Sequence, residues 1–150
     1  MKRLLYKELR LAAHPTSLVF ACLGCLVLVP AYPYSVIWMF GCLAPFLTFS
    51  NARETNDAWY TATLPVTKRE IVLGKCLLVV SLQLFQLLFS VPFALLRNAL
   101  HIANNPVGLD ATPAWYGLGL ILYAVFDAIF LPAFYRSGYK AGRAFLCAAV

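Results

Sequence analysis

The chain has little charge, and what charge it has is unevenly placed. Asp, Glu, Lys and Arg make up 12% of the 150 residues, whereas apolar residues make up 62%. A typical soluble domain carries about 25% charged residues. Charge is absent from residues 17–30, 34–50 and 76–96, and 115–135 holds only Asp127. A water-soluble fold could not cover so much apolar surface, so this pattern predicts a membrane protein.

The sequence also lacks recognisable nucleotide-binding, catalytic and metal-binding motifs. No GxxxxGK[ST] phosphate-binding loop is present, so no ATP site is visible. No Ser/His/Asp arrangement or metal-ligand spacing occurs, so we expect no catalytic residue, no metal and no cofactor. The net charge is +6, but the basic residues are spread over separate connections and form no tract. This spread argues against nucleic-acid binding.

Five cysteines are present, and none lies in a predicted outer loop. A disulfide framework is therefore not expected. Cys22 and Cys25 have CxxC spacing within an apolar run, which allows two interpretations. They can be small residues at a helix contact, or they can form a redox or metal site, although no His, Asp or Glu lies nearby in sequence.

The apolar runs predict an all-α membrane protein with four transmembrane helices. A helix that crosses the bilayer needs ~20 mostly apolar residues. Backbone polar groups in lipid must be satisfied within the segment, which favours helices. With their flanks, the predicted spans cover about 15–30, 34–51, 71–96 and 114–135. Residues 144–150 are apolar but too few to cross, so they are either the start of a fifth span or a short interfacial tail.

The distribution of Lys and Arg predicts the orientation. Eleven of the twelve lie in the N-terminal tail, in residues 51–75 or in residues 136–143, and only Arg97 lies in a connection on the other side. Cytoplasmic loops carry the excess of Lys and Arg. We therefore expect a multi-pass protein of the cell membrane whose N-terminus, residues 51–75 and residues 136–143 are cytoplasmic.

Residues 2–13 have the pattern of a basic amphipathic helix. Arg3, Lys7 and Arg10 fall within an arc of roughly 60° at 100° per residue. Such a helix before a first span is expected to lie in the membrane interface, with its cations near anionic head groups. The alternative is a frayed tail.

Residues 51–75 form the most polar connection. Residues 53–63 contain no Gly or Pro and can form a short helix, on which Arg53 and Asp57 are four apart and so would share a face. Pro65 then breaks the helix, and Thr67 with Glu70 makes a capping box that opens the third span. The pattern indicates an ordered element, although a solvated loop that only joins two spans is the alternative.

Gln83, Gln86 and Asp127 are the candidate functional polar residues inside the predicted spans. Gln83 and Gln86 are three apart and share a face, where they either pack against a neighbouring helix or line a substrate path. Asp127 lies roughly 12 Å from the cytoplasmic end of its span. An acid there is a functional candidate, or it pairs with a basic residue of another span.

The order of these features resembles the permease subunits of the ABC-2 type exporter family. The resemblance rests on the N-terminal helix, the hairpin of spans, and a charged inner loop with Arg-Glu-Thr-Asn-Asp at 53–57 and Leu-Pro-Val-Thr-Lys-Arg-Glu at 64–70. It implies that this loop contacts a separate ATPase subunit. Arg53, Glu54 and Asp57 would touch the ATPase, and Pro65 and Lys68 would shape the turn.

The resemblance implies a permease subunit of an ATP-driven exporter. Its partners would be the ATPase, a second permease subunit and the lipid bilayer, and the chain would not itself be an enzyme. Family members usually have six spans, so a chain with four is either a fragment or a short member whose missing helices a partner supplies. The alternative function is a small non-transporting membrane protein that binds a partner, such as an immunity or assembly factor.

Overall fold

The computed structural model describes residues 6, 8, 15–30, 32–63, 65–101, 110–138 and 140–149, and every regular element within them is a helix. In chain order these are α2 (Pro15–Cys22), the 3₁₀ helix η2 (Leu23–Leu28), α3 (Ser35–Glu54), α4 (Asp57–Ala62), α5 (Lys68–Ala99), α6 (Pro113–Arg136) and α7 (Ala141–Ala149). The predicted all-α fold is confirmed for this part of the chain. The expected interfacial helix at 2–13 lies outside it, apart from Tyr6 and Glu8.

Three of the described helices are long and apolar enough to cross a membrane: α3, α5 and α6, with 20, 32 and 24 residues. The apolar helix that begins at Pro15 is shorter, with eight α-helical and six 3₁₀ residues. At ~1.5 and ~2.0 Å per residue it extends roughly 24 Å, less than the ~30 Å of a bilayer's hydrocarbon. The count of four full-length spans is therefore not confirmed.

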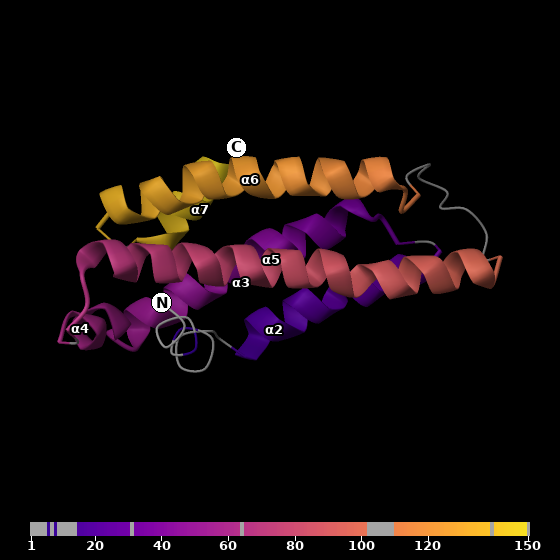
Figure 1. Cartoon of the computed structure of the whole chain (residues 1–150). Helices are drawn as coiled ribbons and strands as arrows, with labels where there is room; N and C mark the ends of the chain where they lie inside the picture. Colours follow the sequence, from indigo (N-terminus) through magenta and orange to yellow (C-terminus); the bar gives the residue numbers. More distant parts are fainter. Residues whose placement is uncertain are drawn as a thin grey trace.

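The helices form a bundle around α5, which runs along its whole length (Figure 1). α2 and η2 pack against α5 and α3, while α6 packs mainly against α3 and α7. Helix α4 lies at the end of the bundle where α5 begins and α6 ends (Figure 1). We call this the α4 end, and the opposite end, with residues 29, 30, 32–34 and 97–101, the far end.

The segment that the sequence left open as a fifth span or a tail is α7. It has nine residues and packs back on α6 and α3. Ala141 and Ala144 are buried, and the Phe145 ring contacts Phe46 and Phe126 at centroid distances of 5.0 and 5.9 Å. In the described chain α7 therefore contributes to the core of the bundle, because its small residues allow close approach and its Phe fills the space between α3 and α6.

Two glycines allow the close helix contacts that membrane bundles favour. A Cβ at Gly24 would lie 2.8 Å from the Gln86 carbonyl oxygen, so η2 approaches the backbone of α5. A Cβ at Gly41 would overlap the Tyr123 hydroxyl and the Gln86 side chain. Side chains at these positions would push the helices apart.

Candidate functional site

The helix predicted from Arg53 onward is broken at the α4 end. Helix α3 ends at Glu54, and Asn56 has φ of 52°, in the left-handed region that Asn tolerates better than most residues. The chain turns there, and α4 begins at Asp57. Arg53 is exposed and Asp57 is buried. The expectation that these two residues share one helix face is wrong, because it assumed a continuous helix.

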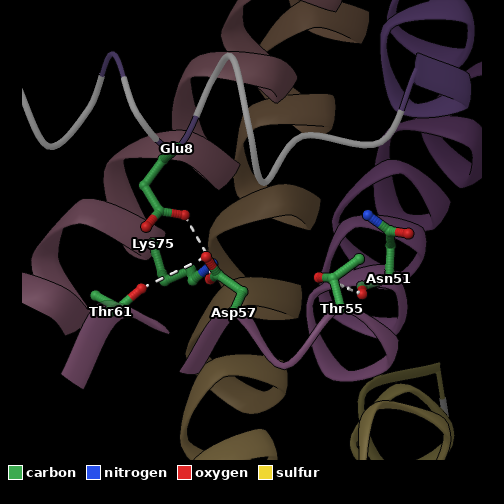
Figure 2. A network of polar contacts seen from close by, with 6 residues as sticks. All are labelled: Glu8, Asn51, Thr55, Asp57, Thr61 and Lys75. Carbon is green, nitrogen blue, oxygen red and sulfur yellow. Dashed lines mark hydrogen bonds and ion pairs between the residues drawn. The ribbon is translucent and has the colours of Figure 1, made fainter. Parts of the chain in front are cut away.

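Asp57 belongs to a buried cluster of charges. Lys75 Nζ lies 2.7 Å from a carboxylate oxygen of Glu8 and 2.5 Å from Asp57 Oδ2. The Thr61 hydroxyl donates a hydrogen bond of 3.4 Å to Asp57 Oδ1. Figure 2 shows both carboxylates turned toward the Lys75 ammonium. We call Glu8, Asp57 and Lys75 the buried triad.

The side chains of the triad are buried, with exposed fractions of 0% for Glu8, 8% for Asp57 and 7% for Lys75. Ions removed from water lose hydration worth several kcal/mol each, so they persist only when they are paired with good geometry. Charge-assisted hydrogen bonds of this length are among the stronger ones in proteins. The triad therefore links α4 to α5 and Glu8 to both.

The opposite face of α4 is open to the surroundings. Trp59 is 76% exposed and Tyr60 is also exposed, while Asp57 and Thr61 face inward. Arg53 and Glu54, at the end of α3, are exposed as well. The α4 end thus presents the aromatic side chains of α4, whose inner face is anchored, together with the charged side chains at the end of α3. Thr55 secures the turn, since its hydroxyl donates to the Asn51 carbonyl at 3.0 Å (Figure 2).

The capping box predicted for the third span is confirmed. The Glu70 carboxylate accepts hydrogen bonds from the Thr67 backbone N–H at 2.9 Å and from its hydroxyl at 2.8 Å, and Thr67 Oγ1 accepts from the Glu70 N–H at 3.3 Å. These bonds favour the ionised carboxylate, and the pKa of Glu70 is lowered, chiefly by the Thr67 N–H and then by its hydroxyl. Pro65 is exposed in the connection between α4 and α5.

A cavity of about 580 Å³ opens between α3, α4, α5 and α6 at this end. Three of the predicted coupling residues line it, namely Arg53, Asp57 and Lys68, whereas Glu54 and Pro65 do not. Its other walls are largely apolar and aromatic: Phe49, Trp59, Ile71, Val72, Phe134 and Tyr135. The cavity therefore has cationic side chains next to apolar walls, and it lies at the end of the bundle.

Gln86 connects four helical segments in the middle of the bundle. Its Nε2 donates to the carbonyls of Ile37 at 2.9 Å and Phe20 at 3.3 Å, and its Oε1 accepts from the Tyr123 hydroxyl at 2.7 Å. The side chain is 0% exposed. Because its amide is fully occupied by α2, α3 and α6, the geometry favours a packing role for Gln86.

Asp127 has a different partner from the one expected. Its Oδ1 accepts a 3.0 Å hydrogen bond from Gln83 Nε2, so it pairs with a neutral amide. Within the described residues Asp127 forms no ion pair. The alternative in which it pairs with a basic residue of another span is therefore wrong for this part of the chain. Gln83, on the same helix face as Gln86, is the residue that meets it.

Reasoning from the sequence missed the structural roles of Glu8, Lys75 and Arg97. Lys75 is the last cation before a long uncharged run on α5, which signals that it needs an anion, but its partners are 18 and 67 positions away. Arg97 is 5% exposed at the far end, 3.7 Å from Asp110 Oδ1 and 5.2 Å from the centre of the Tyr34 ring. It was expected simply as an outer-loop cation.

One comparison with known proteins gives a match. A family model described as ABC-2 family transporter protein matches residues 3–150. No curated protein and no solved structure matches the chain. The resemblance drawn from residues 53–75 is thereby confirmed over nearly the whole chain.

Proposed function

We propose that this chain, which belongs to the ABC-2 family of transporter proteins, is the membrane-spanning permease subunit of an ATP-driven exporter. ATP would be bound and hydrolysed by a separate ATPase subunit, because no phosphate-binding loop is present in the sequence. A second permease subunit would complete the assembly. The excess of Lys and Arg at the α4 end favours a cytoplasmic position for this end, where an ATPase would meet it.

The observation that carries this proposal is the anchored, outward-facing α4. We define the docking surface as the exposed side chains of Arg53, Glu54, Trp59, Tyr60 and Lys68. Aromatic residues and Arg are enriched at protein interfaces, where they supply much of the binding energy. The aromatic side chains of α4 and the Arg at the end of α3 are both exposed at the α4 end, which supports the role of this end as the contact for the ATPase.

In this proposal the buried triad transmits a movement of α4 to the spanning helix α5. A displacement of α4 by the ATPase would act on Asp57, which is paired with Lys75 near the start of the 32-residue α5. Helix α5 extends about 48 Å, so a shift at its first turns would reach the far end of the bundle. In this proposal Asp57 does not touch the ATPase. It ties the docking surface to the spanning helices.

Reversal of charge at Glu54 tests the docking surface. Glu54 is exposed and outside the long apolar part of α3, so Glu54→Lys should leave folding and insertion intact. If Glu54 is desolvated against an ATPase, the reversal should weaken docking by ~2–5 kcal/mol and abolish co-purification. The measurement is recovery of an ATPase from gently solubilised membranes, with monodispersity of the variant in detergent as the check on folding.

Arg143→Glu is the matched control, because it reverses an exposed charge on α7 outside the docking surface. It should retain the ATPase. Undiminished recovery with Glu54→Lys would remove Glu54 from the docking surface. If the unmodified chain recovers no ATPase, the exporter proposal fails, and a non-transporting protein that binds another partner becomes the better explanation.

A further inference from the structure

The cavity of about 580 Å³ at the α4 end has four charged residues in its walls, in two different states. Asp57 and Lys75 are buried and paired with each other. Arg53 and Lys68 are exposed, and within the part of the chain that the structure describes they form no ion pair. Two basic side chains without a paired acid favour an anionic partner, because opposite charges attract and like charges repel.

The other walls of this cavity are mostly apolar or aromatic. Phe49 and Phe134 are buried, and their rings meet edge-on at a centroid distance of 4.6 Å, so this wall belongs to the core of the bundle. Ile71 and Val72 on α5 are half-buried. The volume lies within the ~300–1,000 Å³ that is typical of ligand sites in proteins. A ligand that fills the cavity must therefore combine an anionic group with an apolar body.

An apolar surface continues from this cavity along the bundle. A second, more open groove of about 440 Å³ lies between α5 and α6, and Val72 and Tyr135 line both spaces. The groove is almost wholly apolar, and the one charged residue that lines it, Asp127, is hydrogen-bonded to Gln83. Both helices are long and apolar enough to cross a membrane. An apolar chain that starts in the cavity can therefore extend along the groove into the bilayer.

The cavity lies at the level of the membrane surface. It is at the end of the bundle where α5 begins (Figure 1), and Lys68 precedes the charge-free run 76–96 by eight positions, roughly 12 Å along the helix. Trp59, which also lines the cavity, is 76% exposed, and Trp side chains are enriched at the boundary between membrane and water. The excess of Lys and Arg predicts that this end meets the cytoplasmic leaflet, which carries anionic lipids.

We propose that the cavity binds an anionic phospholipid, with the phosphate of its head group at Arg53 and Lys68 and one acyl chain running past Val72 along the groove between α5 and α6. Charge complementarity selects the anion. The apolar surface that continues into the bundle selects a lipid over a soluble phosphate. The bound lipid borders the docking surface, because Arg53 and Lys68 belong to both. The lipid site does not rest on the proposed function, since it needs no ATPase.

The first test compares three ligands that separate the charge from the apolar body. The chain is purified in detergent, stripped of lipid and titrated with dioleoylphosphatidylglycerol, with dioleoylphosphatidylcholine or with the soluble head group glycerol phosphate, and native mass spectrometry counts the retained molecules. One phosphatidylglycerol per chain should be retained saturably at concentrations at which phosphatidylcholine is not. Equal retention of the two lipids would overturn the proposal, because the site would not distinguish charge. Glycerol phosphate bound as tightly as phosphatidylglycerol would also overturn it, because the site would then be one for soluble phosphates.

A double variant at exposed positions tests the two cations. Arg53→Gln with Lys68→Gln should weaken phosphatidylglycerol binding by roughly 30-fold, since each cation contributes to the attraction of an anionic lipid. The matched control is Arg69→Gln with Arg143→Gln, which removes the same charge from exposed residues that do not line the cavity. This control should bind phosphatidylglycerol as the unmodified chain does. Unchanged affinity in the first double variant, or an equal loss in the control, would overturn the proposal.

Val72→Trp tests the course of the acyl chain without altering a charge. The larger side chain should fill the passage between the cavity and the groove and abolish saturable retention of phosphatidylglycerol. Val80→Trp on the same helix is the control, because Val80 is exposed and lines neither space. Thermal unfolding in detergent checks that both variants are folded. Unchanged retention by folded Val72→Trp would overturn the proposed course of the lipid.

Recovery of the ATPase is measured separately on the same proteins. Val72→Trp should still recover the ATPase, because Val72 does not lie on the docking surface. Selective retention of phosphatidylglycerol by a chain that recovers no ATPase would leave the lipid site assigned and reject the exporter. Recovery of the ATPase by a chain that does not distinguish the two lipids would do the reverse.

Discussion

The two ends of α5 each hold a buried cation, and they hold it differently. Lys75 at the α4 end is paired with two carboxylates that are almost fully buried, at 2.5 and 2.7 Å. Arg97 at the far end lies 3.7 Å from Asp110, whose side chain is 42% exposed, and over the face of Tyr34. Lys75 thus has two short ion pairs to buried carboxylates, whereas Arg97 has a longer ion pair to a partly exposed carboxylate.

This difference follows from the chemistry of the two cations. An ammonium is a compact, strongly hydrated point charge, so burying it requires anions close by. A guanidinium is planar and weakly hydrated, and an aromatic face can cover it. The far end has such faces, since Tyr34 packs edge-on against Trp115, which stacks on Trp38 at 4.9 Å. The α4 end is therefore held by shorter ion pairs than the far end.

The largest expected effect comes from removing the cation of the triad. Lys75→Met should destabilise the protein by ~3–5 kcal/mol, because it removes the ammonium that pairs with both buried carboxylates. Thermal unfolding in detergent, read with the yield of monodisperse protein, measures this. Lys68→Met is the control, since Lys68 is exposed and should change stability little. Equal losses of stability in the two variants would show that Lys75 contributes no more to stability than the exposed Lys68.

A smaller effect is expected at the far end. Arg97→Gln removes a cation–π contact worth ~1 kcal/mol and an ion pair to an exposed carboxylate worth ~0–1 kcal/mol, so these two contacts together contribute about 1–2 kcal/mol, less than the ion pairs of Lys75. Asp110 can be rehydrated after the change, unlike Glu8 and Asp57. Thermal unfolding in detergent measures this loss of stability. A loss as large as that of Lys75→Met would contradict the expectation that Lys75 is more tightly paired than Arg97.

The smallest effect concerns the pH dependence of the α4 end. The pKa of Glu70 is lowered in the folded protein from its ordinary value of 4.5, so its ionised form stabilises the fold at and above that pH. As the pH falls below 4.5 and through the lowered folded pKa, this contribution is lost. Glu70→Gln should therefore flatten part of the acid side of the stability curve. Measured curves that coincide for the two proteins would contradict this.

Features that depend on neighbouring residues were predictable from the sequence. The capping box at Thr67 and Glu70 needs only four consecutive residues, and the structure confirms it. The long helices α3, α5 and α6 follow from uninterrupted apolar runs, because a backbone in lipid must satisfy its own hydrogen bonds. The first apolar segment was overestimated, because hydropathy does not distinguish an α-helix from the 3₁₀ turns that follow Cys22.

The candidate site was predicted only in part. Arg53, Asp57 and Lys68 do meet around one cavity, but the sequence placed Asp57 on an exposed face with Arg53. The left-handed turn at Asn56 separates them. A polar residue between two helical segments allows such a turn without requiring it, so local pattern could not decide between one helix and two.

The sequence by itself determined the membrane character of this protein, its helices, its family and the uneven placement of its basic residues. These properties are sums over neighbouring side chains, and they are the same in any packing of the chain. The tertiary structure alone decided the partners: Glu8 and Asp57 for Lys75, Gln83 for Asp127, and the carbonyls of α2 and α3 for Gln86. A buried charge or amide must find a partner, but which one it finds depends on how helices far apart in sequence come together.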